Sequence, residues 1–308
     1  MTIVCSKCLQ PAITFIRYNG THLCKDHFIQ YVTKRVKKEI RKQGTIDANS
    51  TIGVAISGGK DSVVALQLMY DLYHKRENIT LIGISIDEGI KGYRAESLVI
   101  AKKHCQNLGI DHVIASFKDH IGKTMDEIMK IEPKTYGACS YCGVFRRFCL
   151  NTTAKKFHVD RLVTGHNLDD MSQSILMNFI NADMEKLARL GPHTKVQPGL
   201  IPRMIPLRTI PEKENALFAL LNGFAVHDAV CPYSLDASRG YIKDMVYDLE
   251  EKNPGTRHSI LKSYDTIKEV LASRFPPSKL KTCNTCSEPT MHSECKSCLL
   301  KNQLNTKP

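Results

Sequence analysis

The sequence contains no long hydrophobic run, because no stretch approaches the roughly 18 apolar residues that a membrane-spanning helix requires. Its amino terminus, Met1 to Cys5, also lacks the basic segment and apolar core of a secretory signal. These two absences predict a soluble, cytoplasmic protein with no membrane partner. Because the cytosol is reducing, the twelve cysteines are expected to bind metal rather than to form disulfides.

Acidic residues are in the minority, since 31 Asp and Glu face 43 Lys and Arg, which leaves a net charge of +12. This balance favours a polyanionic partner, and RNA, DNA or an acidic protein would each satisfy it. A helical pattern at 28–44 carries many of the cations. Its basic face is either solvated or in contact with phosphate.

A glycine-rich turn separates an apolar run at 52–56 from a helical pattern at 63–69. The residues of this turn are Ser57, Gly58, Gly59, Lys60, Asp61 and Ser62. Two glycines let a backbone close around phosphate oxygens, the new helix directs free N–H groups at them, and the lysine adds positive charge. The turn therefore predicts a nucleotide site, although its spacing is not that of a Walker A loop. The alternative is a Gly-Gly turn without function.

Strand and helix signals alternate from about 50 to 190. Strands are expected at 51–56, 80–86, 112–117 and 161–165, with helical stretches between them. Short apolar strands between amphipathic helices predict an α/β fold, a parallel sheet with helices on both faces. Ligands bind beyond the carboxyl ends of such strands, where Ser57, Asp87 and His166 fall. Asp87 would hold ribose or magnesium there, or be a solvated turn carboxylate.

Two groups of four ligand-type residues lie near the ends of the chain. Paired C-x-x-C or C-x-x-H turns can present four ligands to one tetrahedral zinc ion and leave no position open for chemistry. We therefore predict two structural Zn²⁺ sites, whose ligands are Cys5, Cys8, Cys24 and His27 in the first and Cys283, Cys286, Cys295 and Cys298 in the second.

Three further cysteines, Cys139, Cys142 and Cys231, form an incomplete set. Three thiolates can ligate three irons of a cubane cluster while the fourth iron stays open and able to bind sulfide. The rival interpretation is a redox pair or persulfide relay that uses Cys139 and Cys142. Two single cysteines in helical patterns, Cys105 and Cys149, are better explained as small core residues.

Arginines follow the central cysteine pair, and a helix is expected to begin at Arg146 and Arg147. These side chains would meet phosphate or polarise the site, or else lie on the surface. A proline-punctuated crossover is expected at 199–208, then a helix at 212–223. Residues 240–274 predict amphipathic helices broken near 253–255.

After the fourth strand comes the segment Gly165-His166-Asn167-Leu168-Asp169-Asp170. This segment, the turn at 57–62 and the three central cysteines, placed between two terminal zinc knuckles, resemble the PP-loop enzymes TtuA and NcsA, the tRNA 2-thiouridine synthetases, over essentially the whole chain. The resemblance implies that Gly165 and His166 lie beside the adenylate and that Asp170 takes part in catalysis. Asp169 would then serve helix capping or magnesium support.

The resemblance also implies a reaction. ATP and Mg²⁺ bind at 57–62, the C2 oxygen of a tRNA uridine is adenylated, and sulfur from a 4Fe-4S cluster held by Cys139, Cys142 and Cys231 replaces AMP. Lys60 would neutralise phosphate charge as it develops. The sulfur donor implied is sulfide or a ubiquitin-like thiocarboxylate carrier, and the protein is expected to be a homodimer.

Two other functions fit parts of this pattern. A tRNA cytidine thiolase of the same superfamily also carries a C-x-x-C and a distant third cysteine, but it lacks the flanking zinc knuckles. A zinc-stabilised RNA-binding scaffold would not need Lys60, Asp61 or Asp170. We predict a zinc finger at 1–28, a basic linker helix at 29–48, a PP-loop catalytic domain at 49–275 and a zinc finger at 276–308.

Overall fold

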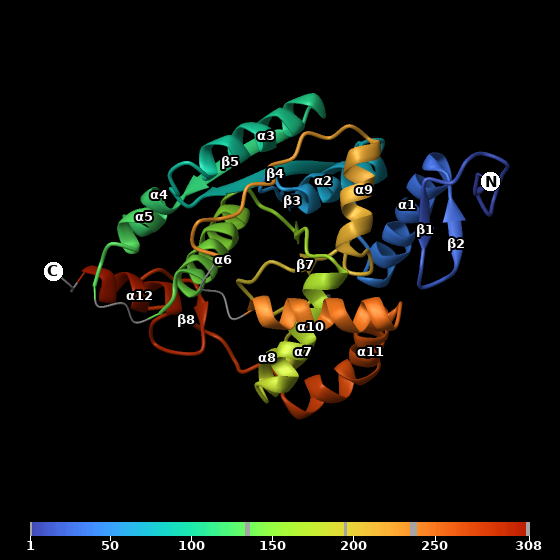
Figure 1. The fold of residues 1–308 in the computed structure, drawn as a ribbon. Coiled ribbons are helices and arrows are strands. Elements are labelled where there is room, and N and C mark those ends of the chain that lie inside the picture. The colour runs from blue at the N-terminus through green and yellow to red at the C-terminus, as the bar shows by residue number, and fades with distance from the viewer. Residues whose placement is uncertain (1, 133–135, 194–195, 235–238, 306–308) are drawn as a thin grey trace.

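The centre of the protein is a parallel β-sheet. The structure, a computed structural model, describes residues 2–132, 136–193, 196–234 and 239–305. All neighbouring strands of its five-stranded sheet are parallel, in the order β5-β4-β3-β6-β7 (Figure 1). The strands are β3 (Ser50–Ala55), β4 (Ile79–Asp87), β5 (Asp111–Ser116), β6 (Arg161–Val163) and β7 (Arg203–Met204). The predicted parallel α/β fold is confirmed.

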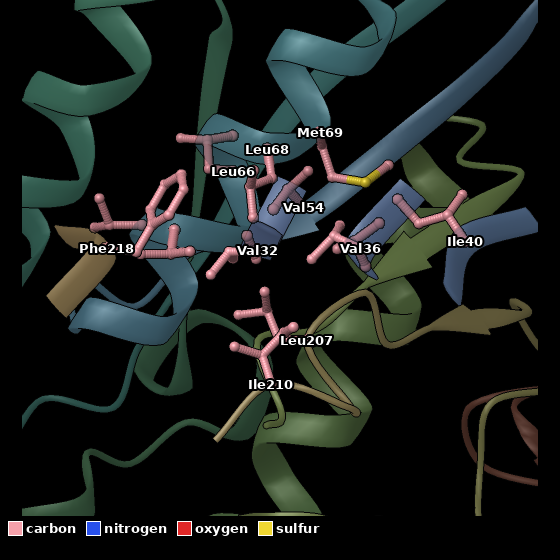
Figure 2. Packing of buried hydrophobic residues seen from close by; sticks show 14 of the residues in the cluster. Val32, Val36, Ile40, Val54, Leu66, Leu68, Met69, Leu207, Ile210 and Phe218 are labelled. Carbon is pink, nitrogen blue, oxygen red and sulfur yellow. The ribbon is translucent and has the colours of Figure 1, made fainter. Parts of the chain in front are cut away.

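Helices cover both faces of this sheet, because alternate strand residues are apolar on either side. The helices on one face are α1 (Lys25–Lys42), α2 (Lys60–Tyr73), α3 (Arg94–Asn107) and α9 (Glu212–Leu221). Figure 2 shows this side of the core, where Val32 and Val36 of α1 lie near Leu66 of α2. The helices on the other face are α4 (Phe117–Ile121), α5 (Met125–Ile128), α6 (Ala138–Lys156) and α12 (Lys296–Asn305).

A separate helical layer lies below the sheet in Figure 1. Its buried core includes Met171, Ile175, Leu261 and Tyr264. The Tyr264 hydroxyl donates to the carbonyl oxygens of residues 187 and 190, so this large side chain is buried without leaving its polar group unpaired. The helices of the layer are α7 (Leu168–Ile180), α8 (Met184–Ala188), α10 (Arg239–Lys252) and α11 (Thr256–Arg274).

Each cysteine-rich end forms a small β-hairpin that packs on the core. The N-terminal hairpin pairs β1 (Thr14–Ile16) with β2 (Thr21–Leu23), and α1 follows directly. The C-terminal hairpin pairs β8 (Lys281–Thr282) with β9 (Pro289–Thr290). An ion pair of 2.7 Å between Glu288 and Lys155 joins this second hairpin to α6. The domain boundaries expected from the sequence stay predictions.

One helix begins earlier than the sequence indicates. The prediction that it starts at Arg146 was wrong, because α6 begins at Ala138 and therefore contains Cys139 and Cys142. Cysteine, serine, tyrosine and glycine are weak helix formers, so the first turns carry little local signal. Burial of Tyr141 against the core stabilises the helix in place of propensity.

The crossover at 199–208 contains β7, a strand that the sequence did not predict. It has two residues and lies at the sheet edge, where it pairs with Leu162 and Val163. Two residues between prolines cannot show the alternation by which strands are recognised. Among the described residues, no helix has both the length and the hydrophobicity to cross a membrane.

Candidate functional site

The glycine-rich turn leaves the sheet between β3 and α2. Gly58 has φ +85°, and a Cβ there would lie 2.2 Å from the Ser97 carbonyl oxygen of α3. Only glycine fits such an approach. Gly59 is the N-cap of α2, so the free N–H groups at the start of this 14-residue helix face the turn.

Two serine hydroxyls hold this turn closed. The Ser62 hydroxyl accepts from the Ser57 N–H at 3.1 Å and donates to the Gly59 carbonyl at 2.8 Å. The Ser57 hydroxyl lies 3.1 Å from that of Ser62 and accepts from the Gly59 N–H at 3.3 Å. The loop is thus ordered by its own side chains, and it needs little rearrangement to receive an anion.

Lys60 points at carboxylates across the turn. Its Nζ lies 2.7 Å from Glu212 Oε1, at the start of α9, and 3.1 Å from Asp61 Oδ2. Burial alone would lower the pKa of Lys60, but these carboxylates outweigh burial and raise it. The lysine is therefore fully charged at neutral pH. Asn215 of α9 donates to Asp61 at 2.9 Å, so α9 supplies site residues that the sequence did not reveal.

The ends of β6 and β4 complete the edge around this turn. Gly165 lies so close that a Cβ there would be 3.0 Å from the Asp61 carbonyl carbon. His166 Nδ1 lies 3.0 Å from the Thr164 hydroxyl. The Asp87 carboxylate accepts from the Gly89 N–H at 2.9 Å, which fits the turn interpretation of this residue. The residues predicted for the nucleotide site thus lie together beyond the carboxyl ends of the strands.

The two aspartates after Asn167 have distinct contacts. Asp170 and Asn167 form a capping box with two hydrogen bonds of 3.1 Å. Asp169 instead accepts from the Glu212 N–H at 2.7 Å and forms an ion pair with Arg257. Asp169 therefore does not cap α7 but accepts from the first N–H of α9, and the alternative role in magnesium support stays a prediction. A catalytic role for Asp170 stays a prediction, since the cap engages its Oδ2.

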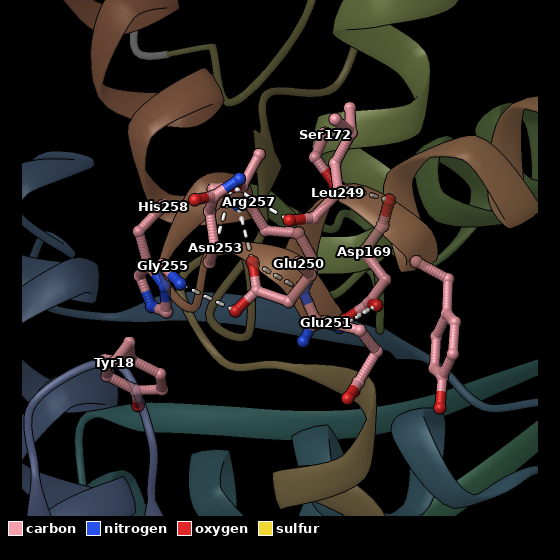
Figure 3. A network of polar contacts seen from close by, with 12 residues as sticks. Tyr18, Asp169, Ser172, Leu249, Glu250, Glu251, Asn253, Gly255, Arg257 and His258 are labelled. Atoms are coloured by element: carbon pink, nitrogen blue, oxygen red, sulfur yellow. Dashed lines mark hydrogen bonds and ion pairs between the residues drawn. The ribbon is translucent and has the colours of Figure 1, made fainter.

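Figure 3 shows how Asp169 is anchored between helices. Arg257 of α11 contacts Asp169 of α7, and its backbone N–H donates to Glu250 of α10 at 2.9 Å. The other Glu250 oxygen accepts from the Gly255 N–H at 2.8 Å. This network fixes the helical layer against the start of α9, where Glu212 meets Lys60.

The three central cysteines come together from two distant segments. Cys139 and Cys142 lie at the start of α6, and Cys231 lies beyond α9. The Cys139 thiol is 3.9 Å from the Tyr233 carbonyl oxygen, which brings these segments into contact. Burial, the nearby Glu88 carboxylate and the other two thiols raise the pKa of Cys142 to about 11 against the opposing Arg146 charge. Three cysteines from two segments that are distant in sequence therefore lie near one another.

A buried carboxylate connects this cysteine site with the glycine-rich turn. Glu88 has 2% of its surface exposed, and Arg146 Nε lies 2.8 Å from its Oε1. Arg146 also donates to Cys142 Sγ at 3.3 Å. On the other side, Arg94 lies 2.8 Å from Glu88 Oε2 and donates to the Ser57 carbonyl at 2.9 Å.

One contact along this path, between Arg94 and Glu88, is an ion pair without a hydrogen bond. The single Nε hydrogen of Arg94 goes to the Ile86 carbonyl at 2.7 Å, so Glu88 Oε2 receives no hydrogen. Arg94 was not predicted from the sequence. Its only local signal was the acidic turn after β4, because a buried carboxylate requires a buried cation.

The terminal groups converge tightly. Within each predicted zinc set the four ligand atoms lie within 4.8 Å of one another. In the first set His27 Nδ1 is 3.5 Å from Cys5 Sγ and 3.3 Å from Cys24 Sγ. Burial would raise the pKa of Cys5, but backbone N–H groups of Cys24 and Lys7 outweigh it and lower it to about 6. This favours the thiolate, the form that binds metal.

The second set repeats this chemistry. Cys286 and Cys295 sulfurs lie 3.6 Å apart. Burial opposes ionisation of Cys283, yet N–H groups of Cys295 and Cys286 lower its pKa to about 6, whereas burial raises the pKa of Cys286 to about 11. Across the described residues these two terminal groups are the closely spaced ligand sets. The three central cysteines do not form such a closely spaced set.

Comparison with known proteins agrees with this geometry. The family model "PP-loop domain" matches residues 28–214, and the model "2-thiouridine synthetase TtuA, N-terminal LIM domain" matches residues 4–29. The "tRNA 2-thiolation protein NcsA" of Haloferax volcanii is 38% identical over 96% of this chain and 97% of its own. The chain belongs to the PP-loop family of tRNA 2-thiolation proteins.

Two further members show the spread of this family. The "tRNA-5-methyluridine(54) 2-sulfurtransferase" of Pyrococcus horikoshii is 32% identical over 98% of this chain and 96% of its own. A solved structure, "U34-tRNA thiolase NcsA from Methanococcus maripaludis with its [4Fe-4S] cluster", is 35% identical, with a TM-score of 0.83 over 99% of this chain and 97% of that one. Relatives of this PP-loop protein are therefore named for two different tRNA uridines, at positions 34 and 54.

Proposed function

We propose that this protein is an ATP-dependent tRNA-uridine 2-sulfurtransferase that forms 2-thiouridine, AMP and diphosphate. The observation that carries the proposal is the contact path from the Ser57 carbonyl through Arg94, Glu88 and Arg146 to Cys142 Sγ. This path supports an anion site at the turn and a sulfur site at the thiols that lie close to each other, beyond the carboxyl ends of the strands. An enzyme that activates an oxygen with ATP and replaces it with sulfur needs both sites within reach of one substrate atom.

ATP with Mg²⁺ would bind at the glycine-rich turn. The open N–H groups at the start of α2 suit phosphate oxygens, and Lys60 is held charged beside them. Its present carboxylate partners are Asp61 and Glu212. A phosphate would release one of them, and Asp61 could then support the magnesium ion. Asp87, Gly165 and His166 lie at the same edge and would contact the nucleoside.

The three central cysteines fit an iron–sulfur cluster. Cys139 is exposed, whereas Cys142 and Cys231 are half-buried, so a group held by them would face solvent on one side. A 4Fe-4S cluster bound by three thiolates supplies an iron without a protein ligand, where sulfide can bind. Arg146 would orient Cys142 through its 3.3 Å contact and place positive charge beside the site.

The reaction then has two displacements. The uridine C2 oxygen attacks the α-phosphorus of ATP, a new O–P bond forms, and diphosphate leaves with the electron pair of the broken P–O bond. Sulfide sulfur next attacks C2, the C2–O bond breaks, and AMP leaves with that oxygen. Lys60 and the turn N–H groups would stabilise the first displacement. Asp170, at the start of α7, would hold the base or assist proton transfer.

Several finer features belong to the same proposal. The two terminal ligand sets would each hold Zn²⁺ and serve folding, because all four positions are filled by protein. The sulfur donor would be sulfide or a ubiquitin-like thiocarboxylate carrier, and the protein would act as a homodimer in the cytoplasm, where thiols stay reduced. Analytical ultracentrifugation tests the dimer. A cytidine thiolase and a non-catalytic scaffold are less well supported, because the named relatives act on uridine.

One experiment tests the reaction. The protein is purified and reconstituted without oxygen, and its iron, sulfide and zinc are quantified. It is then incubated with unmodified tRNA, ATP, Mg²⁺ and sulfide. We expect AMP and diphosphate release together with 2-thiouridine, identified by nucleoside mass spectrometry at position 34 or 54. Omission of sulfide is the control, and it should abolish the thionucleoside.

Three outcomes would change the proposal. Thiocytidine in place of thiouridine would assign the protein to the cytidine branch. Full activity in protein without iron would replace the cluster by a persulfide relay on Cys139 and Cys142. Binding of tRNA without AMP formation under any condition would leave only the scaffold.

A further inference from the structure

A cavity of about 840 Å³ lies between the catalytic core and the C-terminal cysteine module. Arg147 and Phe148 of α6 line one side, and Arg203 of β7 and Lys268 of α11 line another. Cys295 closes the cavity from the module. The cavity therefore exists because the module packs on the core, and neither part would form it alone.

The two arginines in this cavity have no counter-charge. Within the described part of the chain, neither Arg147 nor Arg203 forms an ion pair; Arg203 is half-buried, whereas Arg147 is exposed at the rim of the cavity. Partial desolvation and the charge of Arg146 lower the pKa of Arg147. Burial and the charge of Arg147 lower that of Arg203. Two neighbouring cations in this position repel each other, and an anion bound between them would remove that cost.

The other charged groups nearby do not neutralise them. Lys268 donates to the neutral Pro192 carbonyl at 2.9 Å. Glu288 also lines the cavity, but it is paired with Lys155 at 2.7 Å. Arg189 is paired with Glu185 at 2.8 Å. The net charge of the cavity is therefore positive.

We propose that this cavity binds a phosphodiester of the RNA substrate, with Arg147 and Arg203 as its two guanidinium ligands. The inference deepens the proposed function and rests on it for the identity of the substrate. Arginine matches phosphate because its planar fork donates two parallel hydrogen bonds. Phe148 and His193 in the same lining offer flat faces on which a neighbouring base can stack.

The position of the cavity relative to the sulfur site supports an RNA strand over a small anion. Arg147 follows Arg146, whose guanidinium contacts Cys142. The two adjacent arginines thus divide their roles, one toward the thiol and one into the cavity. A strand whose phosphate lies in the cavity can extend along α6 toward the cysteines. This orients a uridine beside them without any contact to its base edge.

The test measures tRNA binding by fluorescence anisotropy, without ATP or sulfide, over a range of salt concentrations. The variants are Arg147→Gln, Arg203→Gln and the double variant, and the control is Lys118→Gln, which removes an exposed charge of α4. We expect each cavity variant to bind roughly tenfold more weakly. The slope of log affinity against log salt should fall by about 1 per arginine, while the control should change neither quantity beyond its loss of net charge.

Thiolation kinetics provide a second measure. The cavity variants should raise KM for tRNA while AMP release per 2-thiouridine and thermal stability stay at the wild-type values. Removal of an uncompensated cation should not unfold the protein, so a loss of melting temperature would point to a structural role instead.

Other results would overturn the proposal. Wild-type affinity and salt slope in both arginine variants would show that RNA does not use the cavity. Competition by polyglutamate that disappears in the double variant would assign the cavity to an acidic protein. Because binding is measured without chemistry, a wild-type protein that binds tRNA through both arginines but never thiolates it would refute the activity and leave the cavity assignment intact.

Discussion

The terminal and the central cysteine sites differ in how they are built. Each terminal set takes four ligands from one short stretch, and their ligand atoms lie within 4.8 Å. The central site takes Cys139 and Cys142 from α6 and Cys231 from beyond α9, beside a turn that belongs to β3 and α2. A filled local set suits folding, whereas an incomplete set assembled by the sheet suits chemistry.

The largest expected effect separates these two kinds of site directly. Cys142→Ala should lower thiolation by at least about a thousandfold, as loss of a catalytic group commonly does. Its melting temperature should stay close to that of the wild type, because Cys142 is not a ligand of either terminal set. Thiolation assays and thermal unfolding monitored by circular dichroism measure the two quantities.

The matched variant is Cys298→Ala, which should lose zinc from the C-terminal module and unfold it. Because the cavity beside that module would be lost with it, the KM for tRNA should rise. If Cys142→Ala retained full thiolation, or Cys298→Ala kept both zinc ions, the distinction between the sites would be lost.

The next effect concerns the anion-binding turn. Lys60→Ala should reduce AMP formation by about 100- to 1,000-fold, because it removes positive charge where phosphate charge develops. Iron content should not change. Lys60→Arg keeps the charge but alters its geometry. Its rate of diphosphate release should lie between those of the wild type and Lys60→Ala. If Lys60→Ala lost iron to the same extent as it lost AMP formation, the turn and the cysteine site would fold as one unit.

The third effect tests the contact path between the turn and the thiols. Glu88→Gln leaves Arg94 and Arg146 without their buried counter-charge, which should cost about 3–5 kcal/mol in the free energy of unfolding. Chemical denaturation measures this loss.

The matched control is Glu39→Gln, because Glu39 is a buried carboxylate of α1 whose partners are Arg208 and Gln43 rather than residues of the turn. Both variants should lose stability, but only Glu88→Gln should also raise AMP release per 2-thiouridine. Proportional loss of AMP and thiouridine in both variants would reduce Glu88 to a structural residue.

The smallest effect concerns how the N-terminal module is held. The His258 ring of α11 packs against Tyr18 at a tilt of 43°, with ring centroids 4.3 Å apart, and lies 2.9 Å from Arg35. Burial, together with the Arg35 charge, lowers the pKa of His258 to about 4. The unfolded histidine takes up a proton near pH 6.5 but the folded one does not, so stability should fall between about pH 6.5 and 4.

The size of that loss should be at most about 3 kcal/mol, from the difference between the two pKa values. Urea denaturation at a series of pH values measures it. His258→Gln should remove this part of the pH dependence while leaving the zinc content unchanged. A variant with the same pH profile as the wild type would show that other groups control the effect.

Local patterns predicted a large part of the molecule. The strands at 51–56, 80–86 and 112–117 lie within one residue of β3, β4 and β5 at nearly every boundary. Alternation of apolar residues between turn signals depends only on neighbours in the sequence, so these strands can be predicted from the sequence alone. The terminal ligand sets can be predicted for the same reason, because the spacing of a C-x-x-C turn sets its own local geometry.

Other features had no local signal. Neither the start of α6 at Ala138 nor the two-residue strand β7 follows from propensity, because packing against the sheet stabilises both. The capping role of Asp170 rather than Asp169 also depends on tertiary contacts, since Arg257 and the start of α9 engage Asp169.

Local sequence patterns were enough to predict which chemical groups the protein carries: a phosphate-type turn at 57–62, three thiols in an incomplete set and a set of four ligand-type residues at each end. How these groups are related in space follows from packing between distant segments. Glu88 joins the turn to Cys142 through Arg94 and Arg146, and docking of the C-terminal module creates the cavity beside Arg147. The reason is physical: a buried charge takes its partner from whichever segment the fold brings near, and sequence distance does not record that choice.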